Sequence, residues 1–307
     1  MKVVLLLLLS LAVLASEARK FKKLTRKENE QRKSVCGIYG KGYGQNVTLT
    51  RKILNGRKAK IGDAPWAAGI MRADDKFTGT GTIISPWHVL TAAHVPVVPQ
   101  NTTFTSRKEI FVKVGSLCIK HDSCDFVEYK VKHIHLLGNF PLLSEPDVNL
   151  YRGDVAVLEL EEPIEFVDKR IWSACIPEFS RKVDKYPETE VYGFGTHVDE
   201  QLESSYGVLR NLQLKEKQKN CEHFLICAVG DGYKLSTCEG DSGAGLITRG
   251  EENRAVVVGT LSGGDLMCRD RVIGQNGKKH DRSVDVSSFS RLPQYVERLC
   301  ECCGICQ

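Results

Sequence analysis

Short runs rich in β-branched residues, separated by Gly, Pro, Asn and Asp, fill the chain from residue 53 to about residue 299. Examples are residues 81–84, 110–114, 129–135, 155–160, 255–261 and 284–289. Many short strands at such spacing predict an all-β sandwich or barrel. The 307 residues can hold two fused barrels, which fill about 250 residues as one unit. One helical pattern, at residues 292–299, places apolar side chains on a single face.

The first 18 residues have the layout of a signal peptide. Lys2 precedes an apolar run that ends at Leu14, and small residues follow up to Ala18. This run is shorter than the roughly 20 residues that a membrane-spanning helix needs, and no later stretch is long and apolar enough. We therefore expect a secreted, extracellular protein without a membrane span.

Residues 19–52 are polar and basic, then Gly-rich, and are expected to form a propeptide or leader rather than a domain. Residues 1–52 carry 12 basic and 3 acidic side chains, so a net charge of +5 for the chain leaves −4 for the remainder. The main part of the chain therefore lacks the electrostatic footprint of a nucleic-acid-binding protein. The basic stretch at residues 19–33 could steer the chain to an anionic surface, but a solvated charged segment is the preferred interpretation.

Twelve cysteines follow the signal peptide, and in a secreted chain an even number is most simply explained by disulfides. The tail at residues 300–307 has a cysteine spacing that could instead hold zinc, so a cysteine-rich structural or zinc-binding protein is one alternative. His133 and His135 alternate on an expected strand without a third clear ligand, and we expect no metal site and no cofactor. Asn46 and Asn101 begin Asn-X-Thr triplets that predict glycosylation.

Three residues could together build a nucleophilic site. Ser242 stands between glycines, which let the backbone turn tightly and present the hydroxyl. His94 follows an apolar strand and Asp154 begins another. A serine hydroxyl needs a base to take its proton and a buried carboxylate to hold that base in one tautomer. Singly each residue is more simply structural, but together they favour catalysis.

Seven short motifs, in one order along residues 53–299, resemble the trypsin/chymotrypsin family of serine proteases. They are ILNG at 53–56, APW at 64–66, TAAH at 91–94, DVAVL at 154–158, YGFG at 192–195, CEGDSG at 238–243 and TLSGG at 260–264. The resemblance implies two packed six-stranded antiparallel β-barrels with a C-terminal helix, and a serine endopeptidase that hydrolyses proteins or peptides. Residues 24–29 with Cys36-Gly37 also resemble a nematode branch of trypsin-like proteins.

By this resemblance His94 is the general base, Asp154 orients it, and Ser242 attacks the scissile carbonyl. The backbone N–H groups of Gly240 and Ser242 would form the oxyanion hole.

The resemblance also implies a zymogen. Cleavage after Lys52 by another protease would free an α-ammonium on Ile53, which would fold inward and pair with Asp241. Until then the oxyanion loop is expected to be poorly ordered, because an unpaired buried carboxylate is costly.

The substrate-binding residues implied by the resemblance are Ser236, Thr237, Ser262, Gly263 and Gly264. Ser236 takes the floor position where trypsin-like enzymes with a preference for Arg or Lys have Asp. A neutral floor predicts hydrophobic or aromatic substrates. Two alternatives stay open: Val284 would shorten the pocket, and Asp285 at its wall would restore a preference for basic side chains.

Disulfide pairs follow from the family pattern and from proximity in sequence. The family pattern pairs Cys238 with Cys268, and we expect Cys36 to pair with Cys175 and so to keep the leader attached. Short-range pairing is expected for Cys118 with Cys124 and for Cys221 with Cys227.

The chain departs from the family at four positions. Gly79 and Val95 replace a disulfide next to the catalytic His, so a more mobile His loop is expected. Gly263 stands where the family generally has Trp, and Gly245 replaces a usual Pro. A catalytically silent relative that binds a partner is therefore the alternative function, although it gains nothing from an intact triad. We expect a monomer that meets protein substrates, an activating protease and protein inhibitors.

Overall fold

The computed structural model describes residues 21–38, 56–96, 110–120, 123–140, 152–167, 169–179, 185–186, 188–198, 204–217, 221–230, 236–264 and 286–307. The predicted signal peptide lies outside these ranges. Within them, no helix combines the length and the apolar character needed to cross a membrane.

Six antiparallel strands close the first barrel in the order β2-β3-β4-β7-β6-β5. They are β2 (Ala67–Arg72), β3 (Phe77–Ser85), β4 (His88–Thr91), β5 (Ile110–Val114), β6 (Val127–Leu136) and β7 (Ala156–Leu160). Aliphatic side chains such as Ile70, Ile83 and Leu158 are fully buried. Removing their apolar surface from water stabilises the fold by roughly 25 cal/mol per Å². The strands predicted at 81–84, 110–114, 129–135 and 155–160 overlap β3, β5, β6 and β7.

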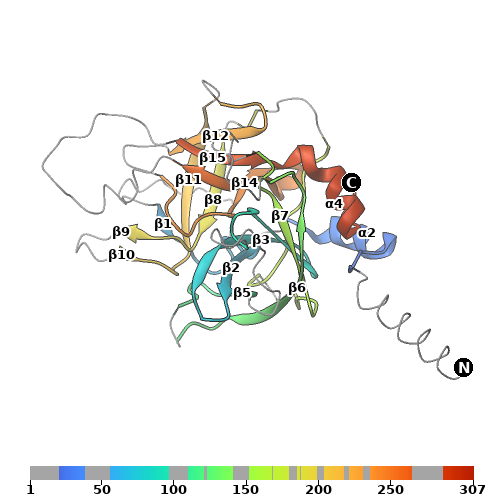
Figure 1. Cartoon of the computed structure of the whole chain (residues 1–307), viewed down its shortest axis with the longest axis horizontal. Coiled ribbons are helices and arrows are strands. Elements are labelled where there is room, and N and C mark those ends of the chain that lie inside the picture. The colour runs from blue at the N-terminus through green and yellow to red at the C-terminus, as the bar shows by residue number, and fades with distance from the viewer. Residues whose placement is uncertain are drawn as a thin grey trace, which may run out of the picture.

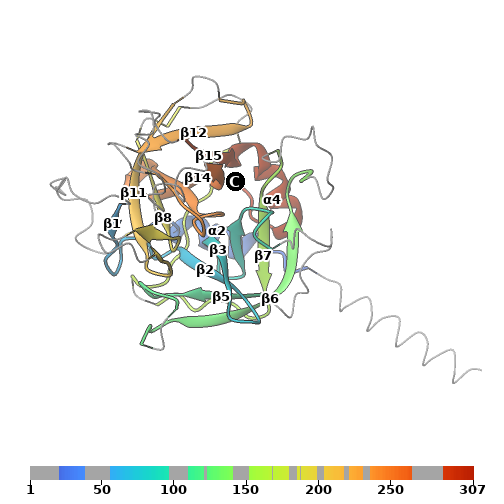
Figure 2. The same ribbon diagram turned by 60° about the vertical axis from the view of Figure 1, so that its left-hand side comes forward.

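Six further strands form the second barrel, which closes where β8 pairs with both β11 and β13. They are β8 (Thr189–Gly193), β11 (Arg210–Glu216), β12 (Leu225–Gly230), β13 (Gly245–Arg249), β14 (Ala255–Gly264) and β15 (Val286–Arg291). The short strand β1 (Arg57–Lys58) is added to β11, and β9 (His197–Val198) pairs with β10 (Ser204–Ser205). Figures 1 and 2 show the two barrels packed against each other. The predicted two-barrel fold is confirmed.

The C-terminal helix begins and ends later than predicted. Residues Leu292–Tyr295 form a 3₁₀ turn, which accommodates Pro293, and α4 then runs over Val296–Cys303. It ends at Gly304, whose left-handed φ of 66° is typical of a helix C-terminus. Val296, Leu299 and Cys303 bury one face of α4.

The leader contains a second helix that sequence analysis did not predict, α2 (Arg26–Val35). Its first turn is closed by a capping box: the Glu28 N–H donates to Thr25 Oγ1 at 3.2 Å, and the Thr25 N–H donates to the Glu28 carboxylate at 2.7 Å. Asn29 and Arg32 on α2 are buried. The interpretation of the basic stretch at residues 19–33 as a solvated segment is therefore wrong for this part, and the Thr-X-X-Glu pattern was the available signal.

The leader docks on the C-terminal tail, where α2 lies beside α4 (Figure 1). The Leu24 N–H donates to the Cys303 carbonyl at 2.9 Å. The Asn29 amide and the Arg32 guanidinium both donate to the Cys306 carbonyl, at 2.8 and 3.2 Å. Both buried polar side chains of α2 are therefore hydrogen-bonded, as expected for polar groups removed from water.

Candidate active site

Asp154 holds His94 through two hydrogen bonds. His94 follows β4 and Asp154 precedes β7, and these strands pair with Thr91 opposite Ala156. One Asp154 oxygen accepts the His94 backbone N–H at 2.9 Å, and the other lies 2.8 Å from ring Nδ1. Asp154 is 1% exposed. Because an ionised carboxylate only accepts hydrogen bonds, Nδ1 carries the proton of the neutral ring and Nε2 is its acceptor nitrogen.

Ser242 lies in a tight loop that packs against the first barrel. Gly240 and Gly243 have φ values of 92° and 83°, which residues with a Cβ rarely adopt. The Thr80 N–H donates to the Ser242 carbonyl at 2.8 Å, and a Cβ on Gly243 would lie 2.0 Å from Thr91 Oγ1. Thr91 is three residues before His94, so these contacts hold Ser242 beside the turn that carries the histidine.

The Ser242 hydroxyl and the backbone N–H groups of Gly240 and Ser242 have no hydrogen-bond partners among the described residues. Among the described residues, no hydrogen bond of 3.5 Å or less joins the Ser242 hydroxyl to the His94 ring. The backbone N–H groups of Gly240 and Ser242 also donate to no described residue. Hydrogen bonds between catalytic groups are often long before a substrate binds.

A serine presented between glycines, next to a buried Asp–His pair, is suited to acyl transfer. A model of the family described as Trypsin matches residues 53–276. The chain belongs to the trypsin family of serine proteases.

Curated relatives include two clotting proteins of Tachypleus tridentatus. Identity to the proclotting enzyme is 27% over 249 residues, covering 75% of this chain and 62% of that protein. Identity to the clotting factor G beta subunit is 27% over 286 residues, covering 86% of this chain and 84% of that protein. This member of the trypsin family thus spans less than two thirds of the proclotting enzyme.

Asp241, next to Ser242, has a carboxylate packed under two glycines. Its oxygens accept the Gly195 and Cys238 backbone N–H groups, both at 2.9 Å. A Cβ on Gly193 or Gly195 would lie 2.0 or 2.5 Å from Asp241 Oδ1. Burial raises the pKa of Asp241 to about 6, although the two N–H donors and the charge of Arg210 act in the opposite direction. A cationic partner would therefore relieve an unfavourable charge here.

A cavity opens beside this carboxylate. Its lining residues are Val191, Gly193, Gly195, Thr196, Arg210, Asn211, Leu212, Ser236, Thr237 and Asp241. Gly56, with a φ of 75°, passes so close to the cavity wall that a Cβ would lie 2.1 Å from the Asn211 carbonyl oxygen. Arg57 on β1 lies opposite Asn211 on β11 and forms an ion pair with Asp63 at 2.7 Å. Gly56 and Arg57 are thereby fixed beside the cavity.

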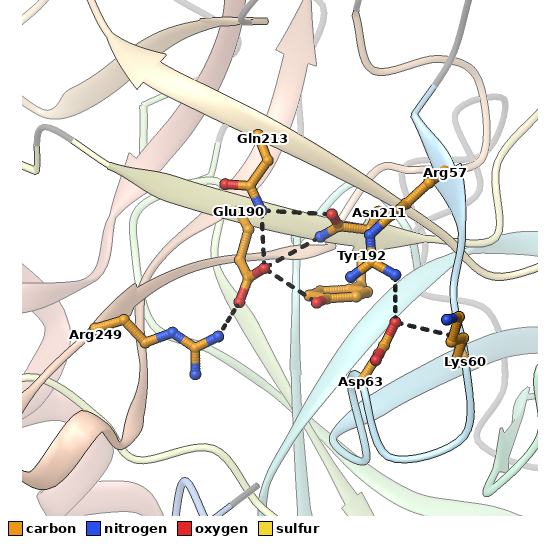
Figure 3. A network of polar contacts seen from close by, with 8 residues as sticks. All are labelled: Arg57, Lys60, Asp63, Glu190, Tyr192, Asn211, Gln213 and Arg249. Carbon is orange, nitrogen blue, oxygen red and sulfur yellow. Dashed lines mark hydrogen bonds and ion pairs between the residues drawn. The ribbon is translucent and has the colours of Figure 1, made fainter. Parts of the chain in front are cut away.

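A polar network supports the strand wall of this cavity (Figure 3). The Glu190 carboxylate, on β8, accepts hydrogen bonds from Tyr192, Asn211 and Gln213 at 3.0, 3.3 and 3.1 Å. It also pairs with Arg249 at 2.9 Å. Glu190 is 5% exposed, and these four donors compensate the burial of its charge.

The predicted substrate-binding residues come together between the nucleophile loop and β14–β15. Gly263 and Gly264 pair with Ser288 and Ser287 of the neighbouring strand. The Thr237 and Ser287 hydroxyl oxygens are 2.9 Å apart, and Ser236 adjoins Thr237. Ser262 and Ser290 hydroxyl oxygens are 2.7 Å apart, and Ser290 also donates to the Asp154 carbonyl at 3.2 Å. Val284 and Asp285 lie outside the described residues.

Two departures from the family pattern have local packing explanations. A Cβ on Gly79 would lie 2.9 Å from both methyl groups of Val95, so Val95, which is 8% exposed, fills the space beside Gly79. A Cβ on Gly245 would lie 2.4 Å from Thr82 Oγ1, so Thr82 occupies the room that a larger residue would need.

Disulfides join Cys36 to Cys175, Cys118 to Cys124, Cys221 to Cys227, Cys300 to Cys306 and Cys302 to Cys303. Cys238 is also disulfide-bonded, whereas Cys268 lies outside the described residues. Among the described residues, no group of three or more His, Cys, Asp or Glu side chains could hold a metal ion. Lys52, Ile53, Asn46 and Asn101 also lie outside the described ranges.

Sequence reasoning missed Thr80 and Ser290. Both residues lie on strands, where Thr and Ser are ordinary, and no local motif marks either one. Their contacts with the nucleophile loop and with Asp154 depend on the packing of the two barrels.

Proposed function

We propose that this chain is a secreted serine endopeptidase that hydrolyses peptide bonds through an acyl-enzyme. The observation that carries the proposal is the buried Asp154–His94 pair beside the loop that presents Ser242. His94 Nε2 takes the proton of the Ser242 hydroxyl as Oγ attacks the scissile carbonyl carbon. The same nitrogen then gives the proton to the leaving amine, and water hydrolyses the acyl-enzyme by the reverse proton transfers.

Charge develops at two points of this reaction, and a group of the chain faces each one. The N–H groups of Gly240 and Ser242 stabilise the oxyanion, and one such donor is typically worth about 3 kcal/mol in the transition state. The carboxylate of Asp154 stabilises the imidazolium that forms on His94.

The chain is made as a zymogen that another protease cleaves after Lys52. Ile53 is three residues before Gly56, a distance of at most about 11 Å along an extended chain, and Gly56 contacts the wall of the cavity beside Asp241. The new α-ammonium enters this cavity and pairs with Asp241. This pairing offsets the cost of the buried carboxylate and orders the adjoining oxyanion loop.

The proposed protease domain covers residues 53–299, behind a signal peptide at 1–18 and a propeptide at 19–52, and residues 300–307 form a cysteine-rich tail. After cleavage the propeptide stays attached through Cys36–Cys175. The substrates are extracellular proteins or peptides, in keeping with relatives that are named as clotting proteins. The mature enzyme is a monomer, glycosylated at Asn46 and Asn101.

A fluorophosphonate probe tests both the activity and its activation. Protein cleaved at Lys52 should label at Ser242 much faster than uncleaved protein, and the Ser242→Ala variant should not label. Absence of labelling after verified cleavage would favour a silent binding module. Equal labelling before and after cleavage would refute the zymogen.

A further inference from the structure

Thr80 contacts the nucleophile loop from the opposite barrel. It lies on β3 of the first barrel and is completely buried. Its backbone N–H donates to the Ser242 carbonyl at 2.8 Å, and its own carbonyl accepts the Thr91 hydroxyl at 2.9 Å. The backbone of Thr80 thus links the segment leading to His94 with the segment carrying Ser242.

The hydroxyl of Thr80 makes two further hydrogen bonds, both to residues next to Asp241 or next to its binding partner Gly195. It donates to the Gly240 carbonyl at 2.9 Å and accepts the Phe194 N–H at 3.2 Å. Phe194 precedes Gly195, whose N–H binds the Asp241 carboxylate at 2.9 Å. One hydroxyl therefore links the nucleophile loop to the Phe194–Gly195 segment, whose Gly195 N–H binds the Asp241 carboxylate.

Gly240 is the point of this loop that most needs such a restraint. A glycine has the widest choice of backbone conformations, so its geometry must be fixed by its surroundings. Phe77 and Gly195 crowd Gly240, because a Cβ there would lie 2.6 Å from the Phe77 ring and 3.0 Å from Gly195 Cα. The Thr80 hydroxyl adds a directional restraint on the Gly240 carbonyl, whereas those contacts only limit the space.

We infer that Thr80 is a positioning residue for the oxyanion hole, and this inference rests on the proposed protease function. Its hydroxyl orients Gly240 so that the Gly240 N–H points to the developing oxyanion. Thr80 itself touches no reacting atom. Supporting groups of this kind matter because a catalytic donor must be held within about 0.5 Å of its working position.

A purely structural role predicts a different result. A buried threonine that only filled space would affect stability, and its replacement by valine would keep nearly the same shape. Thr82 provides the matched control, because it is two residues along the same strand and 1% exposed. Among the described residues, the Thr82 hydroxyl forms no hydrogen bond with the nucleophile loop.

The experiment compares Thr80→Val, Thr80→Ser and Thr82→Val, each cleaved at Lys52. Steady-state kinetics on one peptide substrate gives kcat and KM, with active enzyme counted by fluorophosphonate titration. Thr80→Val should lower kcat by about 10- to 100-fold with KM within about threefold, because loss of a whole oxyanion donor costs about 10²- to 10³-fold. Thr80→Ser and Thr82→Val should stay within about threefold of the parent kcat.

The inference is overturned if Thr80→Val keeps the parent kcat, or if Thr80→Ser is as slow as Thr80→Val. Should Thr80→Val not accumulate as folded protein, Thr80→Ala removes the same hydroxyl without adding a methyl group and carries the same expectation. A parent enzyme that fails to label after cleavage would instead refute the proposed protease function, so the two failures are distinguishable.

Discussion

The Asp154 carboxylate binds both the backbone N–H and ring Nδ1 of His94, so it fixes the position and the tautomer of the ring together. Both functions depend on a group that only accepts hydrogen bonds.

Asp154→Asn should therefore lower kcat at neutral pH by about 10⁴-fold while the protein stays folded. The amide can place an N–H group against Nδ1, which then has to act as the acceptor and leaves the proton on Nε2. Steady-state hydrolysis of a peptide substrate, with circular dichroism to confirm folding, measures this effect. Ser290→Ala is the comparison variant: the Ser290 hydroxyl donates to the Asp154 backbone carbonyl and lies 2.7 Å from the Ser262 hydroxyl, so its loss leaves the Asp154 carboxylate unchanged. A loss below tenfold in Asp154→Asn would contradict the assigned role.

The raised pKa of Asp241 predicts a pH dependence of stability before cleavage. A carboxyl whose pKa rises from 3.8 to about 6 on folding binds its proton more tightly in the folded state. The free energy of unfolding should therefore fall as pH rises from about 4 to about 6, by roughly 3 kcal/mol in total. The loss is complete by about pH 7.

Asp241→Asn should remove this pH-dependent loss from uncleaved protein and also prevent activation by cleavage. Urea denaturation of both proteins from pH 4 to pH 7, in a Ser242→Ala background, measures the difference. If the free energy of unfolding depends on pH in the same way in both proteins, the Asp241 carboxyl does not cause the loss of stability. For activation, Ser242 is restored and the probe is applied after cleavage.

The two barrels could be predicted because strand formation depends on local patterns. Alternation, β-branched residues and turn residues all lie close in sequence, and the family motifs add the strand order. The leader helix escaped prediction because its buried face is polar. Asn29 and Arg32 both donate to the Cys306 carbonyl, and the Asn29 bond spans 277 residues. No local pattern contains that contact.

The catalytic candidates were predictable for the same reason: each lies in a short motif. The support around them was not predictable. The Thr80 hydroxyl reaches Gly240 across 160 residues, and a threonine on a buried strand has no distinguishing sequence context. The contacts of the leader with the tail and the contacts between the two barrels both depend on tertiary packing.

The leader should remain bound after cleavage at Lys52, even without its disulfide. Besides the Cys36–Cys175 bond, Arg32 donates to the Cys306 carbonyl, and burial lowers the pKa of Arg32 to about 10, which still leaves it charged at neutral pH. In a cleaved Cys36→Ser/Cys175→Ser variant, the leader should coelute with the protease in gel filtration. Adding Arg32→Ala should weaken this association, so that a larger share of the leader elutes separately, while the Leu24, Asn29 and Gly37 hydrogen bonds remain.

Two results test the leader contacts separately. A leader that separates from the cleaved double serine variant would show that the disulfide alone holds it. Peptide mapping of the parent protein under non-reducing conditions should recover Cys36 linked to Cys175, and a free Cys36 would contradict the tether. Lys27→Ala, on the exposed side of α2, is the control for Arg32→Ala.

The pocket for the residue before the scissile bond should reject basic side chains. Ser236 gives it a neutral floor, and the Thr237–Ser287 hydroxyl pair, both residues buried, adds no charge. A guanidinium or ammonium buried there without a carboxylate loses several kcal/mol, or more than about a hundredfold in kcat/KM. Peptides with Phe, Tyr or Leu at this position should therefore be cleaved faster than matched Arg or Lys peptides. Cleavage after Arg or Lys at least as fast, and lost in Asp285→Ser, would place a carboxylate in the pocket and refute the neutral floor.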